Sequence, residues 1–225
     1  NYMLQIIIEL IKLSSLIITL NKSVACAGRV ADVLEVQPAM RYPSEGERAP
    51  QESSSRAQSE YAVQFMDVTF TYSGAGAPSL KDISFAVKRG QTVGIIGGTG
   101  SGKSTLVSLI PRFYDAVSGN VLIDGVSVKA YTEEELCKKI GIVQQKAVLF
   151  KGSIRDNLKW GDENATDSEL WQAITAAQAK DIVDGKEGKL DFELEQGGKN
   201  LSGGQKQRLS IARALVKKPE ILILD

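Results

Sequence analysis

The sequence contains no histidine and only two cysteines, Cys26 and Cys137, among its 225 residues. The absence of histidine excludes histidine acid–base catalysis and histidine metal ligation within this chain. The two cysteines are too far apart in sequence for a metal-ligand spacing, and they suit a reducing compartment and ordinary buried thiols. Neither charge is in excess, because 27 basic residues balance 27 acidic ones. No net field therefore favours nucleic acid, and a ligand must be recognised by a local site.

The first 36 residues are mostly apolar and have little that marks a signal peptide, since a basic start and a small-residue cleavage site are missing. A complete membrane span needs about 20 residues with few charges, whereas residues 3–20 contain Glu9 and Lys12. We expect residues 1–36 to be the end of a membrane-domain helix. The alternative is an amphipathic helix lying on a globular domain. Residues 37–60 are rich in proline, serine and charge, and they predict a linker to a domain at 61–225.

A glycine-rich stretch at residues 97–105 follows the apolar run 92–96 and precedes the apolar segment 106–110. This order predicts strand, loop and helix, the context in which backbone N–H groups wrap a phosphate chain. The expected nucleotide contacts are Gly97, Gly98, Thr99, Gly100, Ser101, Gly102, Lys103, Ser104 and Thr105.

Within this loop, Lys103 is expected on the outer phosphates and the Ser104 hydroxyl on Mg²⁺, while Thr105 fits helix packing better. The alternative is a glycine-rich turn with a surface lysine. At average glycine usage the fixed positions of this motif arise by chance in about one chain in a hundred of this length. The surrounding pattern lowers that further, so phosphate binding is favoured.

Antiparallel strands are expected ahead of a parallel α/β core. Residues 62–72 alternate, with Val68, Phe70 and Tyr72 on one face and Val63 and Phe65 on the other. Two further strands are predicted at 81–87 and 121–123.

Two sequences with capping-box spacing, beginning at Thr132 and Thr166, predict helix starts, the second helix reaching about Lys180. A short buried strand is expected at 140–143. The helical segment at about 146–200 is then an insert between two halves of the core.

A third capping sequence carries chemistry as well as structure. Ser202, Gly203, Gly204 and Gln205 lead into an amphipathic helix, and the two glycines leave the backbone open to an anion. The apolar strand 221–224 then ends in Asp225. An acid at the end of such a strand, beside a phosphate loop, is placed to hold Mg²⁺.

In this order and spacing, these residues resemble the nucleotide-binding domain of an exporter-type ABC transporter with the end of its membrane domain attached. The resemblance covers residues 61–225 strongly and the first helix more weakly. It implies an α/β fold, in which a P-loop NTPase core carries an antiparallel β subdomain and a helical insert. The cofactors implied are ATP and Mg²⁺.

The resemblance also gives roles to single residues. Tyr72 is implied to stack on adenine, Gln145 to contact Mg²⁺ and the attacking water, and Ser202–Gln205 to form the LSGGQ signature. By pattern alone, Tyr72 could simply fill the face that it shares with Val68 and Phe70, and Gln145 could be a polar residue at a strand end. Lys103, Gln145 and Asp225 would serve catalysis, and Ser104, Gln145 and Asp225 would hold the metal.

The partners implied are a second nucleotide-binding domain, identical or paralogous, and the transmembrane domains of the same transporter. Each ATP would lie between the phosphate loop of one domain and the signature of the other. The function implied is the ATPase motor of an efflux transporter in the cell membrane, with this domain on the cytoplasmic side. The alternative is a soluble ABC ATPase acting as a mechanical clamp, but the short distance from Gln145 to Leu201 and the apolar first helix favour transport.

Residues 148–158 resemble the surface that receives a coupling helix from the membrane domain, with a buried helix edge as the alternative. One departure from the family pattern concerns hydrolysis. The family places a glutamate directly after the strand-ending aspartate and a histidine later, whereas this sequence ends at Asp225 and has no histidine. The expectation is a chain truncated before the last core strands, which hydrolyses ATP poorly without its general base.

Overall fold

A computed structural model describes residues 2–36, 40–43 and 59–225. The chain divides into two compact units, Asn1–Arg41 and Tyr42–Asp225, and each is described by itself. Most of the predicted linker at 37–60 lies outside the described residues.

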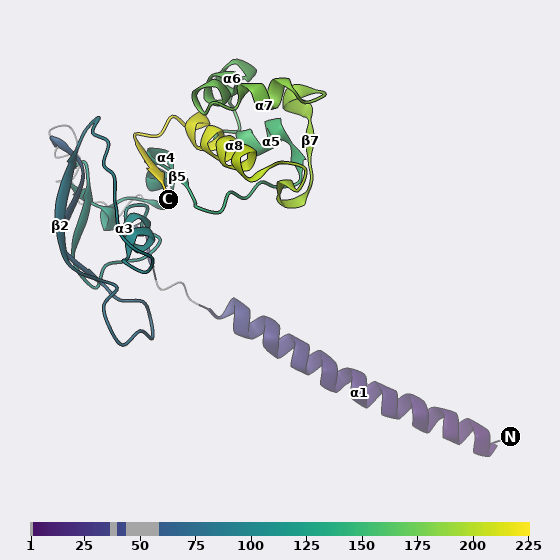
Figure 1. Cartoon of the computed structure of the whole chain (residues 1–225). Helices are drawn as coiled ribbons and strands as arrows, with labels where there is room; N and C mark the ends of the chain where they lie inside the picture. The colour runs from purple at the N-terminus through teal and green to yellow at the C-terminus, as the bar shows by residue number, and fades with distance from the viewer. Residues whose placement is uncertain (1, 37–39, 44–58) are drawn as a thin grey trace. The chain divides into compact units, whose positions relative to one another are not determined.

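The described residues of the first unit form the helix α1 (Tyr2–Leu34), none of whose residues is buried (Figure 1). By length and composition it could cross a membrane. Its hydroxyl groups are bonded within the helix: Ser14 donates to the carbonyl of Leu10 at 3.0 Å, and Thr19 donates to that of Ser15 at 2.9 Å. Such bonds satisfy polar side chains without water, so these residues are compatible with an apolar surrounding.

The second unit begins with a four-stranded antiparallel sheet in the order β2-β1-β3-β4. Its strands are β1 (Tyr61–Phe70), β2 (Leu80–Lys88), β3 (Ser118–Ile123) and β4 (Val126–Ser127). Phe65 pairs with Phe85 across β1 and β2, and their rings stack with centroids 4.7 Å apart. The sheet lies beside α3 in Figure 1.

The predicted division of β1 into two faces is wrong. Val63, Phe65, Val68 and Phe70 are all buried in one cluster. The register shifts between Phe65 and Val68, where Asp67 has a φ of 49°. A bulge of this kind adds a residue to one strand and reverses the alternation, so both halves of β1 bury their apolar residues on the same side.

The parallel part of the core is the pair β5 (Ile140–Val143) and β8 (Ile221–Leu224), with residues 140–143 opposite 221–224. The helix α3 (Lys103–Leu109) precedes β3, and α4 (Glu133–Lys139) leads into β5. The short 3₁₀ helix η1 (Val128–Ala130) lies between β4 and α4. Both predicted strands of this pair are confirmed.

The strand predicted at residues 92–96 is not formed. A strand needs a hydrogen-bonded neighbour, and no described strand pairs with this segment. Val93 and Ile95 are exposed, and Ile96 is 99% exposed. Its apolar sequence therefore has no burial within the described part of the chain.

A group of helices forms the second hydrophobic cluster of this unit. Its helices are α5 (Ile154–Lys159), α6 (Asp167–Ala176), α7 (Lys180–Asp184) and α8 (Gly203–Val216). Figure 1 shows α5, α6 and α7 grouped around α8. Short elements complete this part, namely β6 (Gly152–Ser153), η2 (Lys189–Asp191), β7 (Glu193–Leu194) and η3 (Gln196–Gly198).

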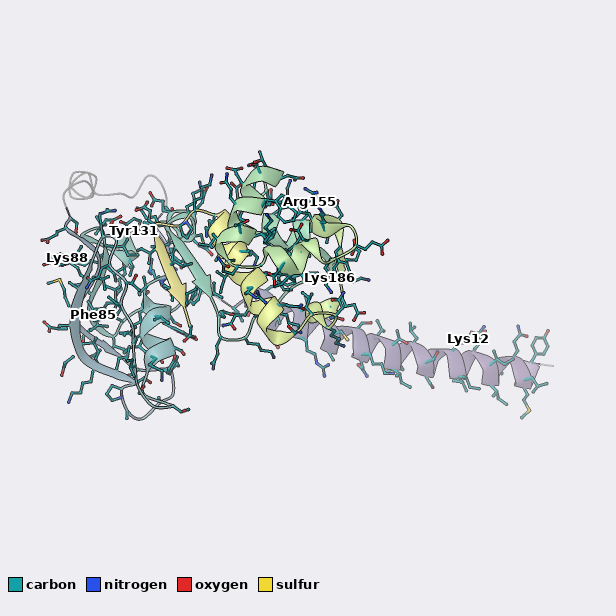
Figure 2. The ribbon with its side chains drawn as sticks, turned by 45° about the horizontal axis from the view of Figure 1, so that its top comes forward. Lys12, Phe85, Lys88, Tyr131, Arg155 and Lys186 are labelled. Atoms are coloured by element: carbon teal, nitrogen blue, oxygen red, sulfur yellow. The ribbon has the colours of Figure 1, made fainter. Side chains whose placement is uncertain are left out.

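Polar side chains fix the loops of this helical part. Arg155 of α5 donates to the carboxylates of Asp167 and Asp191. Asp167 is the first residue of α6, and Asp191 is the last residue of η2. The ammonium of Lys186 lies 4.7 Å from the ring centre of Phe192. Figure 2 labels Arg155 and Lys186 on this group of helices.

The three predicted capping boxes are all present. Thr132, Thr166 and Ser202 each accept from the backbone three residues on, and the residue there returns a hydrogen bond. The helix from Thr166 is shorter than predicted, since α6 ends at Ala176 and Gln178 has a φ of 54°.

The prediction that both cysteines are buried thiols is also wrong. Cys26 and Cys137 are free and exposed. Cys26 lies on α1, which buries none of its residues, and Cys137 lies on the short α4, whose one buried residue is Leu136.

Candidate nucleotide-binding site

The predicted phosphate loop, residues 97–105, folds around the side chain of Lys103. The ammonium donates to the carbonyls of Gly97 at 2.8 Å and Gly98 at 2.7 Å. Gly102 precedes α3 with a φ of 85°, and a β-carbon there would lie 2.9 Å from Leu80 Cδ2. Only glycine combines this conformation with so close an approach of β2, so Gly102 fixes where the loop turns into the helix.

Ser104 and Asp225 meet although 121 positions separate them in sequence. The Ser104 hydroxyl donates to Oδ1 of Asp225 at 2.8 Å. The backbone N–H of Asp225 donates to the carbonyl of Val143 at 3.0 Å, which holds the acid at the ends of both β5 and β8. A hydroxyl and a carboxylate are hard oxygen donors of the kind that Mg²⁺ prefers.

Ser104 and Asp225 suit Mg²⁺ better than they suit a metal ion whose ligands all come from the protein. Among the described residues no group of three or more histidine, cysteine, aspartate or glutamate side chains could hold an ion. Mg²⁺ commonly takes one or two protein oxygens together with water and phosphate oxygens. Ser104 and Asp225 match that requirement.

Gln145 is exposed and follows β5 by two residues. Consecutive Cα atoms are 3.8 Å apart, so the Cα of Gln145 lies within about 8 Å of that of Val143. Val143 in turn bonds to Asp225. Gln145 is therefore at the same end of the β5–β8 pair as the predicted metal ligands.

Tyr72 lies directly against the phosphate-loop helix. Its hydroxyl and Thr105 Oγ1 are 3.0 Å apart, and its ring meets Phe70 and Tyr114 nearly at right angles. Tyr72 is 37% exposed, so part of the ring remains accessible beside the loop. Neither spacing nor periodicity in the sequence relates Tyr72 to Thr105 or Tyr114, so these two contacts could not be predicted.

The signature residues begin α8 in the other hydrophobic cluster. Gln205 N donates to Ser202 Oγ at 3.3 Å, and Ser202 N donates to Gln205 Oε1 at 3.0 Å. Ser202, Gly203 and Gly204 are exposed, and a β-carbon on either glycine would meet nothing within 4 Å. Within the described part of the chain, no hydrogen bond or ion pair joins these residues to the phosphate loop.

An ion-pair network supports the base of β8. Asp124, whose side chain is 5% exposed, binds Arg89 and accepts from Lys139 at 2.9 Å, while Lys139 also donates to Glu220 at 2.6 Å. Burial of Lys139 lowers its pKa, whereas its bonds to Glu220 and Asp124 raise it. The bonds outweigh the burial, so the pKa of Lys139 is raised. Glu220 immediately precedes β8, so the network helps to fix the strand that carries Asp225.

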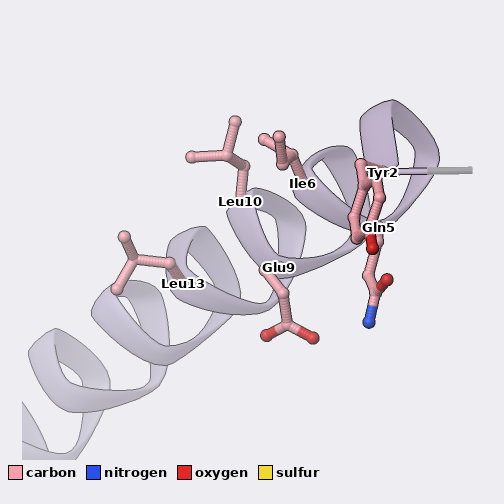
Figure 3. Close-up of a pocket in the computed structure, with 6 residues that line it drawn as sticks. All are labelled: Tyr2, Gln5, Ile6, Glu9, Leu10 and Leu13. Atoms are coloured by element: carbon pink, nitrogen blue, oxygen red, sulfur yellow. The ribbon is translucent and has the colours of Figure 1, made fainter.

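A shallow hollow on α1 is not a second candidate binding site. Its lining residues are Tyr2, Gln5, Ile6, Glu9, Leu10 and Leu13. All of them come from one helix, so the hollow is a strip of open helix surface (Figure 3).

Comparison with known proteins identifies the family. Residues 80–225 match the ABC transporter family model. An uncharacterized ABC transporter ATP-binding protein of Mycobacterium tuberculosis (strain ATCC 25618 / H37Rv) is 40% identical over 230 residues, covering 100% of this chain and 38% of that protein. A β-(1→2)glucan export ATP-binding/permease protein, NdvA, of Rhodopseudomonas palustris (strain BisB5) is 48% identical over 163 residues, covering 72% of this chain and 27% of NdvA.

A solved structure extends the match to the fold. The structure of a bacterial Atm1-family ABC exporter with ATP bound superimposes with a TM-score of 0.80 at 32% identity, over 92% of this chain and 35% of the exporter. This chain thus spans less than two fifths of the length of the relatives that it matches. The predicted α/β fold is confirmed, and the chain belongs to the ABC transporter family.

Proposed function

We propose that the chain is the ATP-binding motor part of an ABC exporter and that it binds ATP together with Mg²⁺. The observation that carries this proposal is the 2.8 Å bond between Ser104 and Asp225, which joins the phosphate loop to the end of β8. Lys103 and the loop N–H groups would neutralise the triphosphate. Bound Mg²⁺ would supply further positive charge between the phosphates.

Other residues of the site take roles that follow from their positions. Ser104 and Asp225 would hold the metal, Gln145 would orient the attacking water, and the exposed part of Tyr72 would receive the base. Ser202 and Gly204 would contact the ATP of a second domain, because the open start of α8 leaves their backbone accessible. ATP would then close two domains head to tail, and its hydrolysis would release them.

Export and membrane attachment are part of the same proposal. NdvA and the Atm1-family protein are named as exporters, and α1 has the length and apolar composition of a membrane-crossing helix. We place the nucleotide-binding unit on the cytoplasmic side, where ATP is available. No specific observation favours a soluble clamp.

An exposed aromatic pair would receive the transmembrane domain. Phe150 and Trp160 stack with ring centres 4.6 Å apart and are 45% and 68% exposed. Asn157, which is buried, bonds to both the N–H and the carbonyl of Phe150 and so fixes the loop that carries this ring.

In proteoliposomes, Trp160→Ala should lower export per ATP hydrolysed and leave ATP binding unchanged. Unchanged export would refute this surface.

The metal site can be tested by comparing ATP affinity with and without Mg²⁺ in the full-length protein. Ser104→Ala should lose Mg²⁺-dependent affinity by at least about 10-fold and keep its affinity for metal-free ATP. Ser108→Ala is the matched control, because the Ser108 hydroxyl lies one turn further along and bonds to the carbonyl of Ser104. If Ser104→Ala retained the full effect of Mg²⁺, the proposed metal site would be wrong.

A further inference from the structure

Three contacts set the orientation of Tyr72. Its hydroxyl is bonded to Thr105, a buried residue of α3. Its ring meets Phe70 with centres 4.8 Å apart at 83°, and Tyr114 with centres 5.3 Å apart at 85°. Phe70 is buried, whereas Tyr114 is 43% exposed. Tyr114 is therefore the more accessible of the two rings that contact Tyr72.

The backbone around Tyr114 is held firmly. Arg112, which is 4% exposed, donates from Nε and Nη2 to the two carboxylate oxygens of Asp115 at 2.8 and 3.1 Å. The Tyr42 ring covers the Arg112 guanidinium at 4.6 Å. The bidentate pair spans Tyr114, so it restrains the backbone that carries this ring.

Perpendicular rings attract one another because the edge of one ring is positive and the face of the other is negative. Pairs of this kind contribute about 0.5–1.5 kcal/mol beyond their buried area. The hydroxyl of Tyr72 is bonded to Thr105 of α3, and a single bond of this kind leaves the ring free to tilt about it. The ring contacts with Phe70 on one strand and Tyr114 beyond α3 restrain this tilt.

We propose that Tyr114 is a positioning residue that holds Tyr72 in the orientation that receives the nucleotide base. The inference rests on the proposed role of Tyr72 and adds a residue to it. Tyr114 acts through its ring, so phenylalanine at this position should also hold Tyr72 in its orientation. An aliphatic side chain of similar bulk should not hold it.

The test measures ATP and inorganic triphosphate affinity of the full-length protein with Tyr114→Ala, Tyr114→Leu and Tyr114→Phe. Tyr114→Ala and Tyr114→Leu should weaken ATP binding about 3–10-fold and leave triphosphate binding unchanged, because triphosphate has no base. Tyr114→Phe should restore ATP affinity. Since Tyr114 acts through Tyr72, the change Tyr114→Ala should have no further effect in a Tyr72→Ala background.

The outcomes separate this inference from the function on which it rests. If Tyr72→Ala leaves ATP affinity unchanged, Tyr72 does not receive the base and the proposed role of that residue fails. If Tyr72→Ala weakens ATP binding and Tyr114→Ala does not, only the role of Tyr114 is overturned. Equal weakening of ATP and triphosphate by Tyr114→Ala would indicate general damage to the loop and would also overturn it. Equal behaviour of the leucine and phenylalanine variants would exclude action through the ring.

Discussion

At the scale of single residues, Glu169 shows how a local motif and a distant partner act on one carboxylate. Lys218 donates to Oε1 at 2.6 Å, and the N–H and hydroxyl of Thr166 donate to Oε2 at 3.0 and 2.9 Å. Lys218 contributes most, and together these bonds lower the pKa of Glu169 to about 2. The helix start of α6 is therefore tied to the end of α8.

The bonds to Glu169 should make the free energy of unfolding depend on pH in the acid range. The pKa of Glu169 is lower in the folded state than its unperturbed value of 4.5, so its contribution is complete above that pH and is lost as the pH falls towards about 2. In an NMR titration of the carboxyl carbon, Lys218→Met should move the Glu169 midpoint upward. Lys138→Met is the control, because Lys138 pairs with Glu134. An unmoved midpoint in Lys218→Met would contradict the assignment.

Features that depend on local sequence could be predicted from the sequence. The turn of the glycine-rich loop into α3 and the helix cap formed by Ser202 and Gln205 are of this kind. The bond between Tyr72 and Thr105 could not be predicted in the same way, because the strand that precedes Tyr72 and the helix that carries Thr105 meet only in the folded chain. The alternation of residues 62–72 indicated a core residue at Tyr72, whereas the family resemblance implied stacking on adenine, and an exposure of 37% is compatible with both roles.

At the scale of elements, long-range contacts determine which face of a strand is buried, whether a strand forms and whether a charged residue can be buried. The alternation of β1 was correct within each half and wrong across Met66 and Asp67, because a bulge reverses the faces there. The apolar run 92–96 has the composition of a strand, but a strand also requires a hydrogen-bonded neighbour. Burial of Asp124 was equally hidden, because its charge is compensated by Lys139 and Arg89 from other elements.

The network around Asp124 yields a stability prediction. Asp124→Ala should lower the free energy of unfolding by about 2–3 kcal/mol, because a nearly buried carboxylate with two cationic partners is removed and those partners are left less well compensated. Chemical denaturation measures this change. Glu134→Ala removes one partner of an exposed pair and should cost less than about 1 kcal/mol. Equal losses in the two variants would show that the network does not support β8.

At the scale of the whole molecule, the two proposed anion sites adjoin different hydrophobic clusters of the unit Tyr42–Asp225. The phosphate loop adjoins the cluster of the β-sheet, and the signature begins a helix of the other cluster. Their separation within one chain supports the proposal that each site is completed by another copy or by a paralogue. An intact signature is compatible with either partner.

The signature should act across this dimer. Gly204→Asp should preserve the fold and ATP binding by the monomer, since a side chain at this exposed position meets nothing within 4 Å. It should abolish ATP-driven dimerisation, because the new carboxylate would face the phosphates of the bound ATP. Light scattering measures the dimer, and Asn164→Asp adds the same charge at another exposed position. A dimer that survives Gly204→Asp would contradict the head-to-tail arrangement.

We propose that the loop around Lys103 binds the triphosphate of Mg·ATP, and calorimetric titration tests this binding most directly. Lys103→Ala should weaken binding by about 10–100-fold, because a charge-assisted hydrogen bond contributes about 1.5–3 kcal/mol. Lys180→Ala removes an exposed lysine at the start of α7 and should leave the affinity unchanged. Equal affinity of the wild-type and Lys103→Ala proteins for Mg·ATP would contradict the proposed phosphate site.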